Sequence, residues 1–327
     1  MDRINVMTSP FFLVYPPVSN QEAEWITKDP KVAERLRSSE LYMIAMRAEA
    51  TFTSLVAKGS NLQIQLESGN SLTDRFELDC ETLAENVFGV GNAPDDIEIR
   101  LGPKIIKLFA NESQDDIDSG RAHPFEWFST EKLIYDVGRK KAGIHGLHRH
   151  REFATYRLLY VGIAKETDTY DRLFAGAHEK RQKILGNEYP TQPNSRVTDE
   201  MFLFAWAADP VVFRTIETGD EFLDSYGQDW DAHYKAVIAD AEKAFVHLLN
   251  PQYNTVKFAN YPKGKDGLSS YGYGGHSFVL AENITFQGSP ESMRGAWLGI
   301  DNMPSNDADI IVTRGDTVRL YKAPSTQ

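Results

Sequence analysis

The chain has 327 residues, of which 41% are hydrophobic and 25% charged, a composition typical of globular proteins and not of disordered or low-complexity chains. Its length predicts two or three domains. A formal net charge of −12 argues against a protein that coats nucleic acid with its whole surface, because phosphate binding requires concentrated basic residues. Cys80 is the single cysteine, which excludes an intrachain disulfide bond and a metal site made of cysteines alone.

The sequence also favours a cytoplasmic protein without a membrane partner. It contains no continuous run of about 18 apolar residues, the length that a membrane-spanning helix requires. The apolar run 11–18 is interrupted by Pro16 and Pro17, and it lacks the basic lead and the small-residue cleavage site of a signal peptide. We therefore expect a reducing compartment, and the cytoplasm is the simplest one.

Residues 1–120 are predicted to form a domain of helices and strands. Helical periodicity over 22–58 predicts two helices. Apolar and polar residues alternate over 62–66 and again over 97–101, which is the period of half-buried strands. The polar, acidic segment 111–120 is the predicted linker to the next domain.

The middle segment, 125–262, alternates between strand and helix signals. Its last helix is the clearest, because its apolar residues recur at spacings of three and four and so form one buried face. The predicted elements are strands over 132–137, 157–162 and 201–207 and helices over 170–185 and 231–249.

The last segment, 263–327, is predicted to be rich in short strands and turns. Two of these strands, 310–312 and 318–321, flank an Arg-Gly-Asp turn and resemble a hairpin. Such short strands need a larger sheet to join, and the strands of 1–120 could supply it. The other short strands are expected over 277–280, 284–286 and 296–300.

Five polar side chains are spread in order along the middle segment. Tyr135 ends one predicted strand, and Tyr160 opens a Tyr-Val-Gly triplet at the end of the next. Arg172 follows twelve residues after Tyr160 and opens a predicted helix. Glu242 lies on the long helix, twelve residues before Asn254 in a Pro-Gln-Tyr-Asn turn. Taken together, these motifs resemble those of the GIY-YIG nuclease family, with Tyr-Val-Gly in the place of Tyr-Ile-Gly.

This resemblance implies a fold and a reaction. The fold would be α/β (α+β), with a small antiparallel sheet flanked by helices, and the reaction would be hydrolysis of phosphodiester bonds. Tyr135 would act as general base toward the attacking water, with Tyr160 supporting it, and Arg172 would hold the scissile phosphate. Glu242 would be the sole protein ligand of a Mg²⁺ or Mn²⁺ ion, since Mg²⁺ keeps several waters and accepts few protein ligands. Asn254 would brace the turn after the helix.

The motifs depart from the family pattern in three places. The first triplet is Leu-Ile-Tyr instead of Gly-Ile-Tyr, and the 25 residues from Tyr135 to Tyr160 are a longer interval than the family has, so an insertion must lie between them. Tyr156 is a rival for the first tyrosine, but it lies on the same predicted strand as Tyr160. His178 matches a family histidine weakly, because it follows Arg172 by six residues instead of one helical turn.

Two basic runs, 139–151 and 178–183, are predicted to contact nucleic acid, because they concentrate Lys and Arg in a chain that is acidic overall. The first run also holds His145, His148 and His150, but no cysteine lies nearby and two glycines loosen the segment, so a zinc site is disfavoured. The predicted contact residues are Arg139, Lys140, Lys141, Arg149, Arg151, Lys180, Arg181 and Lys183.

The sequence therefore predicts a metal-dependent endonuclease that acts on DNA, with RNA as the second substrate. It would comprise an N-terminal α+β domain over 1–120, a nuclease domain over 125–262 and a β-rich segment over 263–327, and docking of the last on the first is an open alternative. Two other functions stay open: a catalytically inactive module of the same fold that binds nucleic acid or supports assembly, and an enzyme of unrelated chemistry. A homo-oligomer is compatible with the sequence.

Overall fold

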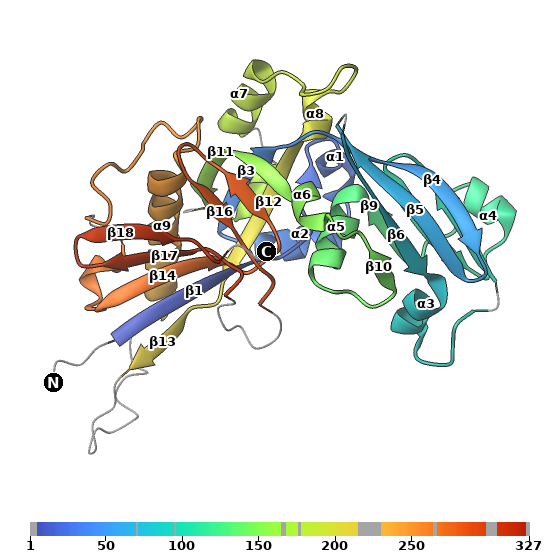
Figure 1. Ribbon diagram of the computed structural model, residues 1–327, viewed down its shortest axis with the longest axis horizontal. Coiled ribbons are helices and arrows are strands. Elements are labelled where there is room, and N and C mark those ends of the chain that lie inside the picture. The colour runs from blue at the N-terminus through green and yellow to red at the C-terminus, as the bar shows by residue number, and fades with distance from the viewer. Residues whose placement is uncertain are drawn as a thin grey trace, which may run out of the picture. The chain divides into compact units, whose positions relative to one another are not determined.

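The chain folds into two compact units (Figure 1). Unit 1 comprises Met1–Arg47, Thr155–Tyr189 and Val197–Gln327, and unit 2 comprises Ala48–Ala154 and Pro190–Arg196. This division differs from three consecutive domains over 1–120, 125–262 and 263–327, because unit 2 interrupts unit 1 and the two ends of the chain share unit 1. The computed structural model describes residues 5–69, 71–94, 96–164, 168–175, 178–214, 230–263, 267–298 and 306–324.

The strands of unit 1 form one mixed sheet, which has eleven strands in the described ranges. The expectation of a small antiparallel sheet is therefore wrong: β1 pairs in parallel with β14 and β11 in parallel with β15, so strands from both ends of the chain extend the sheet. The order is β16-β15-β11-β3-β12-β1-β14-β17-β18, with β13 also paired to β1 and β2 to β12. The bounds are β1 (Asn5–Leu13), β2 (Val18–Ser19), β3 (Leu41–Met46), β11 (Thr155–Ile163), β12 (Met201–Ala208), β13 (Val211–Arg214), β14 (Gly275–Leu280), β15 (Thr285–Gln287), β16 (Ser292–Arg294), β17 (Ile310–Arg314) and β18 (Thr317–Tyr321).

Strand β3 lies where the sequence pattern predicts a second helix. Within 22–58, the helices α1 (Ala23–Ile26) and α2 (Pro30–Arg37) form, but the chain then continues as β3 and β4 (Ala50–Lys58). All six side chains of β3 are buried, and the strand lies between β11 and β12. A strand that is covered on both faces has a continuous apolar run, and periodicity alone does not separate such a run from a helix. The second helix predicted here is wrong.

Three central elements predicted from the sequence are confirmed. Strands β11 and β12 cover 157–162 and 201–207, and α9 (Trp230–Leu249) is the long helix. The helix expected over 170–185 is divided into a π-helical turn, η1 (Tyr170–Ala175), and α7 (Glu179–Asn187). The shorter helices of this unit are α8 (Val197–Glu200) and η2 (Leu268–Ser270).

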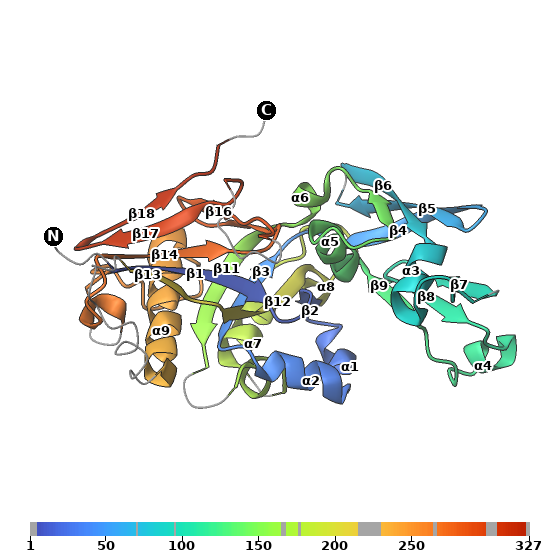
Figure 2. The ribbon, with the colours of Figure 1, turned by 90° about the horizontal axis from the view of Figure 1, so that it is seen from below.

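Helix α9 covers the face of the sheet at β1 and β14 (Figures 1 and 2). Its Phe245 packs against Phe11 of β1 and Phe278 of β14, with ring centroids 5.7 and 6.5 Å apart. Apolar burial of this kind supplies most of the stability of a packed helix. Across the described residues, none of the helices combines the length and apolar character needed to cross a lipid bilayer.

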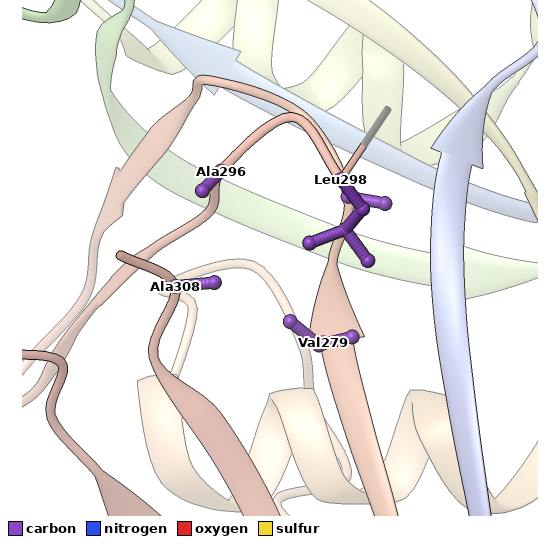
Figure 3. Packing of buried hydrophobic residues seen from close by; sticks show 5 residues of the cluster. Val279, Ala296, Leu298 and Ala308 are labelled. Atoms are coloured by element: carbon purple, nitrogen blue, oxygen red, sulfur yellow. The ribbon is translucent and has the colours of Figure 1, made fainter. Parts of the chain in front are cut away.

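The C-terminal strands belong to the same sheet as the N-terminal strand β1. The hairpin of β17 and β18 forms as predicted, and β17 pairs with β14. Through a buried apolar cluster, the chain that follows β16 packs against β14 (Figure 3). The cluster consists of Val279, Ala281, Ala296, Leu298 and Ala308. The strand expected over 296–300 does not form over 296–298, and residues 299–300 lie outside the described residues.

Unit 2 contains two smaller sheets, with strand orders β10-β6-β5-β4 and β7-β8-β9. The strands predicted over 62–66 and 97–101 are confirmed as β5 and β7. The predicted linker 111–120 is wrong, because it contains α4 and joins β8 to β9, which pair with each other inside this unit. The bounds are β5 (Asn61–Ser68), β6 (Leu72–Asp79), β7 (Ile97–Leu101), β8 (Ile105–Ala110), β9 (Glu126–Ser129), β10 (Ile144–Gly146), α3 (Cys80–Phe88), α4 (Gln114–Asp118), α5 (Thr130–Gly138) and α6 (His150–Phe153).

The strand predicted over 132–137 is wrong, because these residues form helix α5 of unit 2. The helix begins after Ser129, whose side chain accepts a hydrogen bond from the backbone N–H of Lys132 and so acts as an N-cap. Leu133 and Ile134 face the interior. The short apolar run that suggested a strand is therefore one buried face of a helix.

Candidate active site

Two tyrosines from neighbouring strands of unit 1 form the centre of the candidate site. Tyr42 on β3 lies opposite Gly162 on β11 in antiparallel register. Tyr160 precedes Gly162 by two residues, so its side chain points to the same face of the strand. The ring centroids of Tyr42 and Tyr160 are 6.0 Å apart. Strand β11 therefore pairs in antiparallel orientation with β3. The pairing predicted between 132–137 and 157–162 is wrong, because 132–137 is helical.

Gly162 makes this arrangement of rings sterically allowed. A β-carbon at Gly162 would lie 2.7 Å from the ring of Tyr160 and 2.7 Å from both the Cζ and the hydroxyl of Tyr42. Such distances are far below van der Waals contact, so any other residue would displace one of the two phenols. The glycine of the Tyr-Val-Gly triplet is therefore required by packing.

Arg172 lies on the π-helical turn η1, and π-helical turns are frequent at functional sites. Its Nε donates a hydrogen bond to the hydroxyl of Tyr42 at 2.9 Å. The side chain is otherwise exposed, and its two Nη groups make no hydrogen bond to any residue in the described ranges. One edge of the guanidinium is thereby fixed, while its two Nη groups have the geometry to bind an anion.

His178 joins the cluster from the start of α7. Its Nδ1 accepts a hydrogen bond from the backbone N–H of Arg181 at 3.0 Å and caps the helix. Its Nε2 lies 2.9 Å from the hydroxyl of Tyr42. Because Nδ1 is an acceptor, the ring proton resides on Nε2 and is donated to Tyr42. Burial, together with the charges of Arg172 and Arg181, lowers the pKa of His178 to about 4, so the ring is neutral at pH 7.

The hydroxyl group of Tyr42 takes part in three hydrogen bonds. Its oxygen accepts from Arg172 and His178, and its proton is donated to the oxygen of Tyr160. Burial, and next the neighbouring Tyr160, raise the pKa of Tyr42 well above its usual value. Tyr42 is fully buried whereas Tyr160 is half-buried. Tyr42 therefore stays protonated and orients its neighbours, and Tyr160 is the phenol that can meet a ligand.

Glu242 brings a negative charge to the same cluster from α9, which packs against β11. Burial raises the pKa of Tyr160, and the charge of Glu242 raises it further, while the bond from Tyr42 and the charge of Arg172 lower it. Burial opposes the charged form of Arg172, but Tyr42, Tyr160 and Glu242 together raise the pKa of Arg172. The predicted residues Tyr160, Arg172, His178 and Glu242 are thus brought together.

Comparisons with models of protein families, with curated proteins and with solved structures found no match. Function must be inferred from the chemistry of the cluster itself. That chemistry is a half-buried phenol, an open guanidinium edge and a carboxylate, with a neutral histidine behind them. This set can bind a phosphate and take a proton from a neighbouring group.

The donor set suits a cation that takes few protein ligands. Glu242 is half-buried, and the phenol of Tyr160 lies within its electrostatic reach. Mg²⁺ is commonly bound through one or two carboxylates, with the remaining positions filled by water and phosphate oxygens. Among the residues that the structure describes, no group of three or more His, Cys, Asp or Glu side chains is placed to hold a metal, and this includes His145, His148 and His150.

Asn254 acts as a brace on the strand that carries Tyr160. Its Oδ1 accepts from the backbone N–H of Val161 at 2.9 Å, and its Nδ2 donates to the carbonyl of Val161 at 2.8 Å. The preceding Tyr253 donates its backbone N–H to Leu159, at a β-bulge in the pairing of β3 with β11. The Pro-Gln-Tyr-Asn turn therefore fixes the backbone on both sides of Tyr160, and bulges of this kind re-aim side chains next to active sites.

Tyr135 belongs to unit 2, whereas the residues described above belong to unit 1. It lies on α5, where the guanidinium of Arg139 stacks over its ring at 4.4 Å from the centroid. Tyr42, which the sequence analysis did not select, is the tyrosine on the strand that pairs with β11. The signal for Tyr42 was a Leu-Tyr pair at the start of the apolar run 41–46, far from Tyr160 in the sequence.

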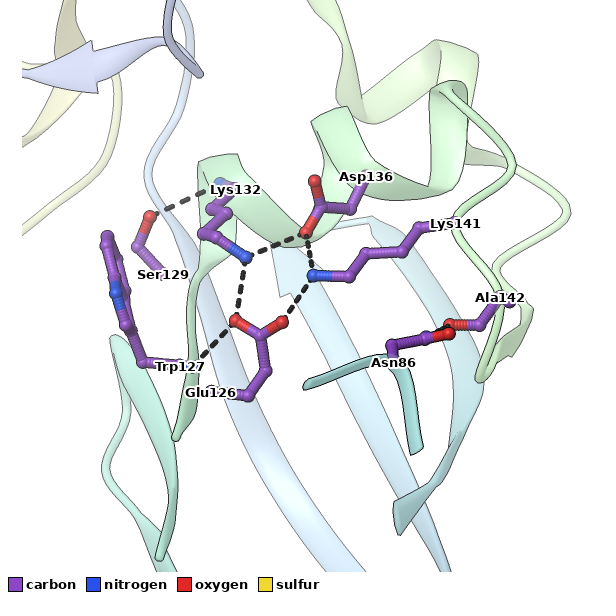
Figure 4. A network of polar contacts seen from close by, with 8 residues as sticks. All are labelled: Asn86, Glu126, Trp127, Ser129, Lys132, Asp136, Lys141 and Ala142. Atoms are coloured by element: carbon purple, nitrogen blue, oxygen red, sulfur yellow. Dashed lines mark hydrogen bonds and ion pairs between the residues drawn. The ribbon is translucent and has the colours of Figure 1, made fainter. Parts of the chain in front are cut away.

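The predicted basic contacts of the first run also lie in unit 2, and two of them, Lys141 and Arg149, have acidic partners. Figure 4 shows Lys141 in a network with Glu126, Asp136 and Lys132, in which the Nζ of Lys132 lies 3.0 Å from Glu126 and 2.8 Å from Asp136. Arg149 pairs with a glutamate one helical turn later. The remaining members of this run are Arg139, Lys140 and Arg151.

The second basic run lies on α7, next to His178. Lys183 is exposed, and Lys180 is partly exposed with an ion pair of 3.4 Å to Glu179. Arg181 is buried and binds Asn20 and backbone carbonyls at the end of η1, including that of Leu173 at 3.0 Å. Arg181 therefore holds η1 in place, and the basic side chains of α7 that can reach a ligand are those of Lys180 and Lys183.

Proposed function

We propose that the chain is a metal-dependent endonuclease that hydrolyses phosphodiester bonds of DNA at the cluster of Tyr160, Arg172 and Glu242. The observation that carries the proposal is the position of Arg172. Its Nε is fixed on Tyr42 while the residue is exposed, and its charge is coupled to Tyr160 and Glu242. The resemblance of these motif residues to those of GIY-YIG nucleases supports the same chemistry.

The phosphate-binding role falls to Arg172. Two parallel N–H groups on the open edge of a guanidinium match two oxygens of a phosphate, and the charge persists at every relevant pH. The bond from Nε to Tyr42 fixes the plane of the guanidinium before a ligand arrives. Pre-organised donors of this kind stabilise the charge that develops on phosphate oxygens during hydrolysis.

The proton-accepting role falls to Tyr160. As a phenolate, it would take a proton from the attacking water, and the hydrogen bond from Tyr42 and the charge of Arg172 both favour the phenolate. Burial and the charge of Glu242 oppose it. A Mg²⁺ or Mn²⁺ ion held by Glu242 would supply positive charge that offsets this carboxylate and that stabilises the leaving oxygen.

Tyr42 and His178 act as positioning residues in this proposal. Tyr42 is fully buried, so it does not touch a substrate, and its three hydrogen bonds direct Tyr160 and Arg172. His178 remains neutral and donates its Nε2 proton to Tyr42. A charged histidine at this place would repel Arg172, so the low pKa of His178 preserves the arrangement.

The substrate would approach over α7. Lys183 and Lys180 are three residues apart and share one face of this helix, which begins at the candidate site. A small basic surface suits a chain with a net charge of −12, because it concentrates phosphate binding at one place. The resemblance of the motifs to those of GIY-YIG nucleases favours DNA over RNA as the substrate. We also propose that the protein acts in the cytoplasm.

The decisive experiment is a cleavage assay of the purified chain on single- and double-stranded DNA and RNA, with Mg²⁺, Mn²⁺ or a chelator. We expect cleavage of DNA that requires the cation and that falls about 10³-fold in Glu242→Gln, equivalent to roughly 4 kcal/mol of transition-state stabilisation. Glu34→Gln, which changes an exposed acid on α2, is the matched control and should cleave as the parent does.

Two results would contradict the proposal. One is the absence of cleavage of every substrate by the parental chain in the presence of either cation. The other is cleavage by Glu242→Gln at the parental rate. Binding of DNA without cleavage would favour the alternative of an inactive binding module.

A further inference from the structure

A second polar cluster of unit 1 lies in its interior and has no part in the chemistry above. Asp240 of α9 is 2% exposed, and its Oδ2 accepts from the hydroxyl of Tyr261 at 2.8 Å and from the Nε2 of His276 at 2.6 Å. The hydroxyl of Tyr261 also lies 3.2 Å from the Oγ1 of Thr313. His276 belongs to β14 and Thr313 to β17, so strands from the C-terminal end of the chain meet α9 here.

Asp240 and Glu242 lie on opposite sides of α9. They are two residues apart, which corresponds to about 200° around the axis of an α-helix. Asp240 faces β14 and β17 through the bonds just described, whereas the charge of Glu242 reaches Tyr160 on β11. The rotation of α9 about its axis therefore determines both positions at once.

Apolar packing alone does not fix this rotation sharply. Phe245 contacts Phe11 and Phe278, but apolar burial is non-directional, whereas hydrogen bonds depend steeply on angle. With side chains, an α-helix has a radius of about 5–6 Å, so a rotation of about 20° moves a side-chain tip by about 2 Å. Displacements of about 1 Å can lower a catalytic rate 10²-fold.

The segment after α9 links the two clusters. His247, near the end of the helix, bonds through Nδ1 to the carbonyl of Phe258 at 3.0 Å. This segment begins with the turn in which Asn254 braces Val161 beside Tyr160, and it ends at Tyr261. Asp240 thus anchors the helix and the following segment with one carboxylate.

We propose that Asp240, Tyr261, His276 and Thr313 form a positioning network that sets the rotation of α9 and thereby places Glu242 relative to Tyr160 and Arg172. The proposal rests on the nuclease function proposed above. It assigns a role to the C-terminal strands, since β14 and β17 complete the active site from the far side of α9. These residues do not touch the substrate and act through Glu242.

The test removes single hydroxyl groups and follows the metal dependence of cleavage. In Tyr261→Phe, we expect kcat to fall about 10–100-fold and the Mg²⁺ concentration for half-maximal cleavage to rise several-fold, with the KM for DNA unchanged within about twofold. Thr313→Val removes the outer hydroxyl and should give a smaller change in the same direction. Tyr273→Phe is the control: it removes a hydroxyl that bonds His233, nine residues before Glu242 on the same helix.

The outcomes separate the two proposals. If the parental chain cleaves and a folded Tyr261→Phe keeps the parental kcat and Mg²⁺ midpoint, the network has no positioning role. If the parental chain does not cleave DNA, the proposed function is contradicted, and with it the positioning role of the network in that function. If Tyr261→Phe does not fold, Thr313→Val decides: a changed Mg²⁺ midpoint at unchanged KM supports the network, and a parental midpoint contradicts it.

Discussion

Tyr42 lies opposite Gly162 on the neighbouring strand, and its hydroxyl would be 2.7 Å from a β-carbon at that position. The same absent β-carbon makes room for the ring of Tyr160. The glycine, the two phenols and Arg172 therefore form one packing unit, in which a change at any member moves the others.

Gly162→Ala should disrupt this unit. The added methyl group must displace one of the two rings, so we expect a loss of about 1–3 kcal/mol in the free energy of unfolding, as for other overpacked sites, and a larger loss of cleavage. Urea denaturation and the cleavage assay measure the two effects. Gly186→Ala is the control, because open space surrounds Gly186 on α7; if both variants behave alike, the packing argument fails.

Asn254→Ala should leave two buried backbone groups of Val161 without partners. At about 1–3 kcal/mol for each unsatisfied group, we expect destabilisation of roughly 2–4 kcal/mol. Asn254→Asp keeps an acceptor for the N–H but has no donor for the carbonyl, so it should be nearly as harmful. Thermal denaturation of both variants measures the loss, and Asn187→Ala, at an exposed position of α7, is the control. If the Asn254 variants are as stable as the parent, Asn254 does not brace the strand.

His178 should make the stability of the chain depend on pH in the acidic range. The unfolded chain binds a proton on this residue from near the usual pKa of about 6.5 downward, whereas the folded chain binds it only near pH 4, since its pKa is lowered to about 4. The unfolded state thus holds more protons between these values, and stability falls as pH falls through this window.

The size of this effect can be bounded. A full shift corresponds to up to about 3 kcal/mol between pH 6.5 and pH 4. His178→Asn keeps a side chain that can cap α7 but cannot titrate, so its free energy of unfolding should vary less over this range. Denaturant titrations at several pH values provide the measurement, and parallel pH profiles for parent and variant would exclude His178 as the source.

Lys183 and Arg181 should respond differently to neutralisation although both lie on α7. Lys183→Gln should weaken DNA binding and lower the slope of log affinity against log salt by about one unit, as for the loss of one phosphate contact. Arg181→Gln should instead lower the melting temperature, because Arg181 is buried and bonded to Asn20 and Leu173. If the salt dependence of DNA binding is unchanged in Lys183→Gln, the proposal that α7 contacts the DNA is contradicted.

Helices and strands whose apolar residues recur at a regular local spacing were predictable from the sequence. Those that depend on pairing with strands far away in the chain were not. Helix α9 was predicted because its apolar stripe is local. Helix α5 was mistaken for a strand because a short apolar run fits both, and the decisive signal was the cap at Ser129. Strand β3 was mistaken for a helix because its continuous apolar run reflects burial between two strands that come much later in the chain.

The candidate site was predicted in part for the same reason. Arg172, Glu242 and Asn254 all follow Thr155 in unit 1, in a part of the chain that only the short segment Pro190–Arg196 of unit 2 interrupts. Tyr42 is separated from that part of the chain by Ala48–Ala154 of unit 2, and no local sequence pattern indicates a pairing across such a distance. The π-helical turn also explains the unusual interval from Arg172 to His178, since both reach the hydroxyl of Tyr42.

The insertion of Ala48–Ala154, the main part of unit 2, between β3 and β11 has a consequence for the order of folding. Met46 and Arg157 are cross-strand neighbours, although more than a hundred residues lie between them. Closing an unstructured loop of that length is slow, because contacts between distant parts of a chain form late. If Ala48–Ala154 folds first, its two ends become the ends of a short connection, and the two strands that carry Tyr42 and Tyr160 can pair as the strands of a simple hairpin do. We therefore expect that changes which delay the folding of unit 2 will slow the appearance of activity during refolding without altering the activity finally reached.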